Sequence, residues 1–253
     1  TSFVVKLPFK KGTEKDYSDD ISIADLDETA LAGKKILLAE DNEINQYVIA
    51  SILREWNIDV TVVPDGAEAI KKAAENHYDL ILMDLKMPGI SGLEASEHIL
   101  YKLNKSVPIL ALSANSLPIE IEKTRQAGMT DFVTKPVSPT VLYRKLLDML
   151  HVVESDRWTV SAPATENGAA TTFDLSTLHD LARGSDEFII TTLGLFLEKI
   201  PAIVHQAKDA WENGKIEEIR NLAHKMKSSA ALLKFEPLST VIADIENTND
   251  IEQ

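Results

Sequence analysis

Cysteine is absent from the sequence, so disulfide bridges and thiolate metal sites are excluded. No stretch approaches the roughly 20 uninterrupted apolar residues that a membrane-spanning helix needs. The first residues, TSFVVKLPFK, lack the basic end and apolar block of a secretory signal peptide. Neither the dinucleotide-binding nor the P-loop glycine fingerprint is present, which disfavours both classes of nucleotide enzyme. These absences are compatible with a cytoplasmic location.

Positive charge is also scarce, because 26 lysine and arginine residues stand against 40 aspartate and glutamate residues, a formal net charge of -14. An acidic surface repels phosphate backbones, so we expect no nucleic-acid partner. Protein partners and divalent cations suit such a surface better. The length of 253 residues is enough for two ordinary domains.

One region alternates between short apolar runs and segments with helical spacing of apolar residues. Strands are expected at residues 34–39, 59–63, 80–84, 108–113 and 131–134. Helices are expected at residues 42–56, 65–75, 91–103, 118–127 and 138–150. This alternation predicts an α/β fold, a five-stranded parallel sheet with helices on both faces. A flavodoxin-like strand order is the first choice, which places a site at the carboxyl ends of the strands.

The flanking sequences have a different character. Residues 1–10 contain a loosely alternating run and are expected to form a strand, followed by a polar, acidic linker over residues 11–33. Residues 151–172 are mostly small and polar and predict a second, flexible linker. Residues 173–253 are expected to form an all-α domain. Its apolar spacing predicts helices at residues 186–212, 215–233 and 237–246.

Three acidic side chains fall where two strands of the predicted sheet end. Glu40 and Asp41 follow the first strand, and Asp84 ends the third. Crowded carboxylates repel one another, and a hard divalent cation with oxygen ligands, Mg²⁺, relieves that repulsion. Ser113 ends the fourth strand and Lys135 follows the fifth, and they add a hydroxyl and an ammonium. A carboxylate nucleophile, a metal, a hydroxyl and a cation are the parts needed for phosphoryl transfer.

The blocks ILLAEDN, LILMDLKMPGISG, ILALSA and DFVTKP resemble a response-regulator receiver domain in their order and spacing, over residues 34–150. The resemblance implies that Asp84 accepts the phosphoryl group. It also implies that Asp41 holds Mg²⁺ directly, Glu40 holds it through water, and the Lys86 backbone carbonyl completes the protein ligands.

The same resemblance gives roles to residues on the last two strands. Lys135 would pair with phosphoryl oxygens, and Ser113 would donate a hydrogen bond to one of them. Phe132 stands where the family keeps an aromatic switch residue, although a buried strand phenylalanine explains it equally well. Pro136 after Lys135 implies a cis peptide bond, as in the family.

A histidine in the helical tail stands apart from the other five. On the helix expected over residues 215–233, His224 and Lys227 lie off the apolar stripe, so we expect His224 to face solvent. An exposed imidazole can attack an acyl phosphate. The string AHKMKSSAALL resembles a histidine-containing phosphotransfer domain, which makes His224 a second phosphoacceptor and Lys227 its partner. Two positions depart from this family: Ser228 stands where it usually has glycine, and Lys234 stands where it has glycine or alanine.

The phosphotransfer family is a four-helix bundle, and the tail supplies only three of the expected helices. We therefore expect a truncated bundle with an apolar groove along Phe196, Met226 and Ile242, and self-association through the tail as one way to cover it. SFVVKLPF at the start resembles the closing strand of a histidine-kinase ATP-binding domain. Together the segments resemble the C-terminal part of a hybrid sensor histidine kinase.

The resemblance implies a two-component phosphorelay. A histidine kinase core, of the same or a sister chain, would phosphorylate Asp84, and the group would pass to His224 and on to a separate response regulator. The parent protein resembles a kinase and could be anchored in a membrane upstream. This segment lacks the kinase's ATP-binding and dimerisation core, so whether it is itself an enzyme stays open, and no membrane contact is expected of it.

Two alternatives remain at this point. An interaction module that is never phosphorylated would have the same fold. An aspartate-nucleophile phosphatase is also α/β and uses Mg²⁺, but that family has a second aspartate where this chain has Lys86.

Overall fold

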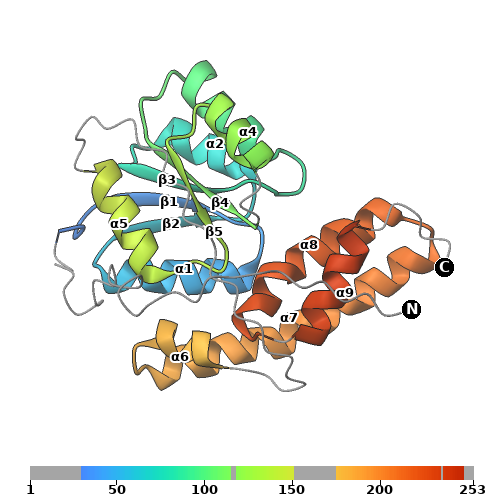
Figure 1. Ribbon diagram of the computed structural model, residues 1–253. Coiled ribbons are helices and arrows are strands. Elements are labelled where there is room, and N and C mark those ends of the chain that lie inside the picture. The colour runs from blue at the N-terminus through green and yellow to red at the C-terminus, as the bar shows by residue number, and fades with distance from the viewer. Residues whose placement is uncertain (1–29, 115–117, 151–174, 235, 248–253) are drawn as a thin grey trace, which may run out of the picture.

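The computed structural model describes residues 30–114, 118–150, 175–234 and 236–247 (Figure 1). The predicted N-terminal strand and most of the two predicted linkers lie outside these residues. Five strands form one parallel sheet: β1 Lys35–Ala39, β2 Asp59–Val63, β3 Leu80–Asp84, β4 Ile109–Ser113 and β5 Asp131–Thr134. The strand order is β2-β1-β3-β4-β5, which confirms the predicted α/β fold and its flavodoxin-like order.

Helices alternate with these strands as the sequence predicts. They are α1 Glu43–Glu55, α2 Gly66–Glu75, α3 Gly92–Glu97, α4 Pro118–Gln126 and α5 Pro139–Leu150. The oxygen of the Asn42 side chain accepts hydrogen bonds from the first amides of α1, and Asp65 caps α2 in the same way. The helix expected over residues 91–103 is α-helical only to Glu97 and continues as the π-helical turn η3, His98–Lys102.

The sheet is buried on both faces because successive strand residues point to opposite sides. In β1, Ile36 and Leu38 pack in the cluster that includes α1 and α5. Leu37 and Ala39 pack in the second cluster, which includes α2 and α3. The two helical layers leave open only the edges and the ends of the strands (Figure 1).

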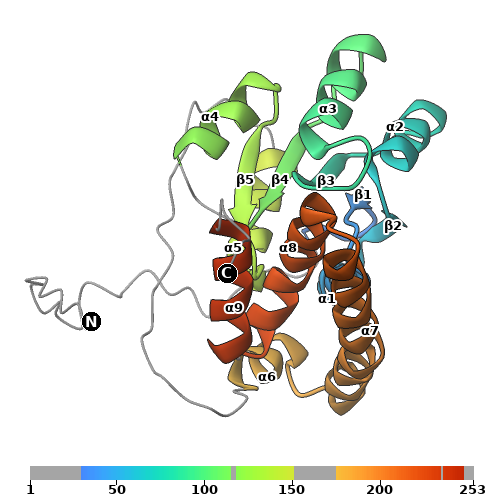
Figure 2. The ribbon, with the colours of Figure 1, turned by 90° about the vertical axis from the view of Figure 1, so that its right-hand side faces the viewer.

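The tail consists of α6 Ser176–Ala182, α7 Asp186–Glu212, α8 Ile216–Leu232 and α9 Glu236–Asn247. The short helix α6 is not among the three predicted helices. Helix α8 packs against both α7 and α9 (Figure 2). A small core joins these helices, formed by Ile203, Ala223, Met226, Ala230 and Ile242. The tail is therefore a packed helical unit built around α8.

The predicted apolar groove along Phe196, Met226 and Ile242 is wrong, since all three side chains are buried. Met226 and Ile242 pack against each other's helices in the tail core, and Phe196 belongs to the cluster that α1 shares with the tail. The exposed apolar residues of α7 lie on another side: Ile190, Leu197, Val204 and Trp211.

Within the described ranges, α7 is long and apolar enough to cross a membrane by length and composition alone. The expectation from uninterrupted apolar runs did not foresee this, because polar residues are spread along the helix. In the structure α7 contacts α1, α6 and α8, so one side of it is used in packing. Its other side carries the exposed apolar stripe, and 22% of its apolar window is buried.

Candidate functional site

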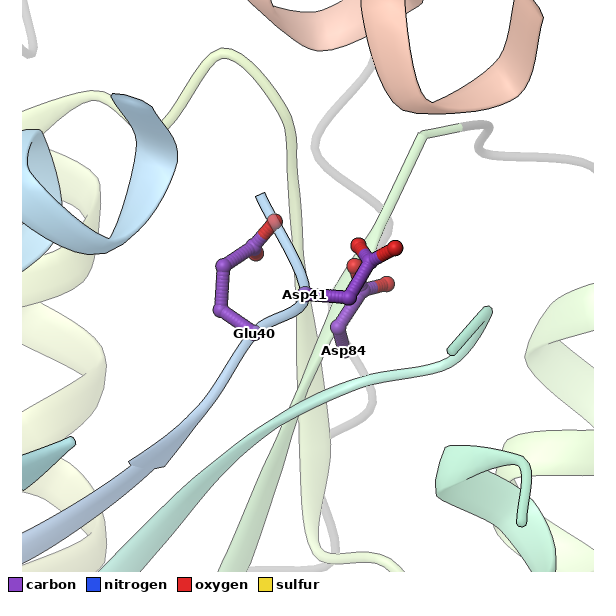
Figure 3. Close-up of side chains that lie close together, drawn as sticks. All are labelled: Glu40, Asp41 and Asp84. Carbon is purple, nitrogen blue, oxygen red and sulfur yellow. The ribbon is translucent and has the colours of Figure 1, made fainter. Parts of the chain in front are cut away.

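Three carboxylates converge beyond the ends of two neighbouring strands. Glu40 and Asp41 follow β1, Asp84 ends β3, and these strands pair in parallel. One oxygen from each side chain lies within 4.8 Å of the other two (Figure 3). Glu40 is fully buried, Asp84 is 4% exposed and Asp41 is half-buried. The predicted acidic cluster therefore forms, and it forms largely out of contact with water.

The surrounding backbone holds the cluster in place. The Lys86 amide donates a hydrogen bond to Asp84 Oδ1 at 3.1 Å, and the Asn45 side chain donates one to Glu40 Oε1 at 2.8 Å. Gly92 begins α3 directly against this turn, where a Cβ would lie 1.9 Å from the Asp84 carbonyl oxygen. Any larger residue at position 92 would therefore displace the backbone of Asp84.

Lys135 lies between two of the carboxylates. Its Nζ is 2.6 Å from Glu40 Oε2 and 2.6 Å from Asp84 Oδ2, and its side chain is only 6% exposed. Burial alone would lower the pKa of this ammonium, but the attraction of the two carboxylates outweighs burial and raises the pKa. Lys135 is therefore a permanent cation at the site. The predicted cis bond between Lys135 and Pro136 is confirmed.

The donor set fits a hard divalent cation. Burial raises the pKa of Glu40 to about 7, and although Lys135 opposes this shift, the charge of Asp84 adds to it. Burial also raises the pKa of Asp41, where Lys225 opposes the shift and Asp84 adds to it. Ionising these carboxyls together is unfavourable because they are buried and close to one another. Mg²⁺ prefers closely spaced carboxylate oxygens as ligands, and its charge would offset their repulsion. Glu40, Asp41 and Asp84 are thus the residues that would hold it.

Magnesium binding is expected to weaken as the pH falls below 7. The raised pKa of Glu40, about 7, keeps a proton on this carboxyl that the cation must displace. The apparent affinity should fall about tenfold from pH 8 to pH 6, as one competing proton dictates. Calorimetric titration of the chain with Mg²⁺ at both pH values checks this, with Glu40→Gln as the variant that should flatten the profile. Equal affinities at the two pH values would contradict the assignment.

Ser113 and Phe132 also lie where the predicted sheet places them. Ser113 ends β4, next to Asp84 on β3, and its hydroxyl donates a hydrogen bond to Glu120 Oε2 at 3.0 Å. Sequence reasoning missed Glu120, because nothing in the spacing of α4 indicates which residue meets the β4 end. Phe132 is buried in the sheet core, and the Lys145 ammonium lies 5.6 Å from its ring centroid.

Helix α8 of the tail lies over the acidic cluster and the start of α1. The Asn42 side chain donates hydrogen bonds to the Lys225 carbonyl at 2.6 Å and to Ser229 Oγ at 2.9 Å. The Asn45 side chain donates one to Ser228 Oγ at 2.8 Å. Lys225 Nζ lies 3.7 Å from Asp41 Oδ2. The two predicted halves of the function, the carboxylates and the histidine helix, thus meet in one site.

His224 is half-buried rather than fully solvent-facing as predicted. It is not part of the tail core, and its neighbours Lys225 and Ser228 contact the receiver side, so docking of α8 accounts for the reduced exposure. A positive charge on His224 would lower the pKa of the Asp41 carboxyl, against the effect of burial. Lys227 is half-buried on the same helix.

A second area of contact supports the docked tail. Helices α6 and α7 pack against α1, where the rings of Tyr47 and Phe188 stack with centroids 5.7 Å apart. Lys199 Nζ lies 2.8 Å from Glu43 Oε2. The packing is therefore apolar where Tyr47 meets Phe188 and charged where Lys199 meets Glu43, and α1 carries both receiver residues of these contacts.

Two families match the sequence. Residues 36–147 match the family described as response regulator receiver domain, and residues 191–252 match the Hpt domain. The crystal structure of the receiver domain of sensor histidine kinase PA1611 from Pseudomonas aeruginosa PAO1, with a magnesium ion in its active-site cleft, is 41% identical. That alignment covers 48% of this chain and 100% of the other, with a TM-score of 0.45.

Curated relatives are much longer than this chain. Hybrid signal transduction histidine kinase I of Dictyostelium discoideum is 38% identical over 118 residues, which are 44% of this chain and 7% of that protein. Sensor protein EvgS of Escherichia coli O157:H7 is 28% identical over 216 residues, which are 84% of this chain and 17% of that protein. The chain thus spans less than a fifth of these relatives.

Proposed function

We propose that a phosphoryl group passes between Asp84 and His224 within this receiver-plus-Hpt phosphorelay module, which is homologous to C-terminal parts of hybrid sensor histidine kinases. The single observation that supports this most is the docking of α8 over the acidic cluster, with Lys225 beside Asp41 and Ser228 bonded to Asn45.

The receiver step follows from the groups around Asp84. Its carboxylate attacks the phosphorus of a phosphorylated donor, and the donor leaves with the bonding electron pair. Lys135, already 2.6 Å from Asp84 Oδ2, is placed to pair with the phosphoryl oxygens, and the Ser113 hydroxyl would turn from Glu120 to donate to one of them. A bound Mg²⁺, held by Glu40, Asp41, Asp84 and the Lys86 carbonyl, would neutralise the charge that develops on those oxygens.

The second step uses the docked helix. A ring nitrogen of His224 attacks the phosphorus of the acyl phosphate, a new P–N bond forms, and the P–O bond to Asp84 breaks. The freed carboxylate returns to its ion pair with Lys135. Lys227, three residues after His224, would steady the transferred group. The reverse reaction uses the same contacts, and the geometry favours neither direction.

The partners follow from this chemistry. We place the histidine kinase core of the same or a sister chain before Asp84 and a separate response regulator after His224. Receiver and Hpt domains interact with kinases and response regulators in phosphorelays and are typically cytoplasmic, so we assign the segment to the cytoplasm. The proposal is tested by loading Asp84 of the intact chain and asking whether base-stable label, the mark of phosphohistidine, appears on the tail.

Self-association through α7 is part of the proposal. Ile190, Leu197, Val204 and Trp211 have between 50% and 80% of their surface exposed, and they recur every seven residues. That period places them on one face over about 32 Å, and a seven-residue apolar repeat on one face is typical of helices that pair. A second copy of the same stripe matches it in length and character, which favours a dimer of this chain.

The chain is therefore expected to dimerise reversibly, and Leu197→Glu should weaken the dimer roughly hundredfold, because each copy loses a buried leucine and gains a charge in the interface. Sedimentation velocity over a range of protein concentrations measures this. Tyr101→Glu, which changes an exposed apolar residue on the receiver, is the matched control. A chain that stays monomeric at every concentration rules the dimer out.

A further inference from the structure

Two asparagines of the receiver meet two serines of the tail. Asn42 Nδ2 donates to Ser229 Oγ at 2.9 Å and to the Lys225 carbonyl at 2.6 Å, and Asn45 Nδ2 donates to Ser228 Oγ at 2.8 Å. Asn42 is 3% exposed, Asn45 is 5% exposed and Ser229 is fully buried. Three hydrogen bonds with buried donors therefore join the receiver to the tail, between the start of α1 and about one turn of α8.

The receiver aims these donors by its own structure. Asn42 Oδ1 accepts hydrogen bonds from the amides of Ile44 and Asn45, which fixes the oxygen toward α1 and turns the NH₂ group outward. The Asn45 NH₂ group is shared between Glu40 Oε1 and Ser228 Oγ. Contacts within the receiver thus hold both side chains: Asn42 caps α1, and Asn45 donates to Glu40. The tail supplies the remaining acceptors.

Contacts at consecutive residues of one helix fix its register. Ser228 and Ser229 differ by about 100° around α8 and by about 1.5 Å along it. A slip of one residue would break both serine contacts and turn His224 by the same angle relative to the receiver. The ion pairs of Lys225 with Asp41 and of Lys199 with Glu43 end in long flexible side chains, which tolerate such a slip.

We infer that Asn42, Asn45, Ser228 and Ser229 form a latch that sets the register of α8 on the receiver and makes the tail selective for receivers with Asn-x-x-Asn at the start of α1. This inference rests on the proposed transfer between Asp84 and His224. It also gives Ser228, where the sequence departs from the small residue usual in its family, the specific role of acceptor for Asn45. These four are positioning residues and touch none of the reacting atoms.

The test follows transfer inside the intact chain. His224 is first phosphorylated with phosphoramidate in a chelator, excess reagent is removed, and Mg²⁺ is added to start transfer to Asp84. Quenched samples are divided into base-stable and base-labile label over time. Ser228→Ala leaves a buried Asn45 donor without its acceptor, so the rate should fall about tenfold. Ser228→Thr, which keeps the hydroxyl, should transfer at the rate of the unchanged protein.

Two further measurements separate a latch from a loss of fold. Ser239→Ala on α9 changes a hydroxyl of a helix that contributes no residue to the latch and should leave the rate unchanged. In an Asn45→Ala chain, Ser228→Ala should have no further effect, since the pair acts as one unit. Two results would overturn the latch. One is a transfer rate in the Ser228→Ala chain equal to that of the unchanged chain. The other is a double variant in which the rate reductions caused by Ser228→Ala and Asn45→Ala multiply. If the base-stable label of the unchanged chain does not decrease after Mg²⁺ is added, the transfer from His224 to Asp84 is itself refuted.

Discussion

Replacing Asp84 by asparagine is expected to abolish labelling of the receiver by acetyl phosphate and Mg²⁺. The amide carries no negative charge and is too weak a nucleophile to form the acyl phosphate. The fold should survive, because Lys135 keeps its ion pair with Glu40 and the Lys86 amide keeps an acceptor oxygen at position 84. Measurement of bound phosphate by intact-protein mass spectrometry shows the loss directly.

Two matched variants make this result specific. Asp65→Asn changes another receiver aspartate but keeps a good helix cap on α2, so labelling should be unaffected. Asp41→Asn leaves the nucleophile in place but removes a carboxylate from the cluster, so labelling should persist only at higher Mg²⁺ concentrations. Labelling of the Asp84→Asn chain equal to that of the unchanged chain would show that another residue accepts the group.

The sheet and its acids could be predicted from the sequence because both depend on local patterns. β1 and β3 are continuous apolar runs, and the acids at 40, 41 and 84 follow those runs directly. Parallel pairing then brings the ends of the runs together regardless of details elsewhere. Asp65 immediately precedes α2 and caps it, which is likewise a local pattern.

The docking of the tail could not be predicted, because its contacts join residues about 180 positions apart in sequence. The spacing of apolar residues in α7 indicates that the helix has buried sides, but not which partner covers each of them. For that reason Phe196 was expected in an open groove, whereas it packs in the cluster shared with α1. The exposure of His224 was overestimated on the same ground, since only the partner surface of α8 determines it.

Replacing His224 by glutamine is expected to remove all base-stable label from a chain loaded through Asp84. Glutamine has a similar reach but no nucleophilic ring nitrogen, so the phosphoryl group stays on Asp84 as a base-labile acyl phosphate. The total label taken up from acetyl phosphate should be at least as high as before, because entry through Asp84 does not use the histidine. Acid and alkaline treatment of parallel samples separates the two species.

The other tail histidines in the described residues provide the controls. His179 is exposed on α6, and His205 is exposed on α7 beside Asp209, its Nε2 lying 3.8 Å from Oδ2 of that residue. Neither helix lies over the carboxylates, so His179→Gln and His205→Gln should leave the base-stable label intact. Among the residues that the structure describes, α8 is the helix that carries a histidine beside contacts with the cluster, with Lys225 next to Asp41 and Ser228 one helical turn after His224. Base-stable label that survives His224→Gln but disappears in either control variant would mean that the docked helix is not the path of transfer.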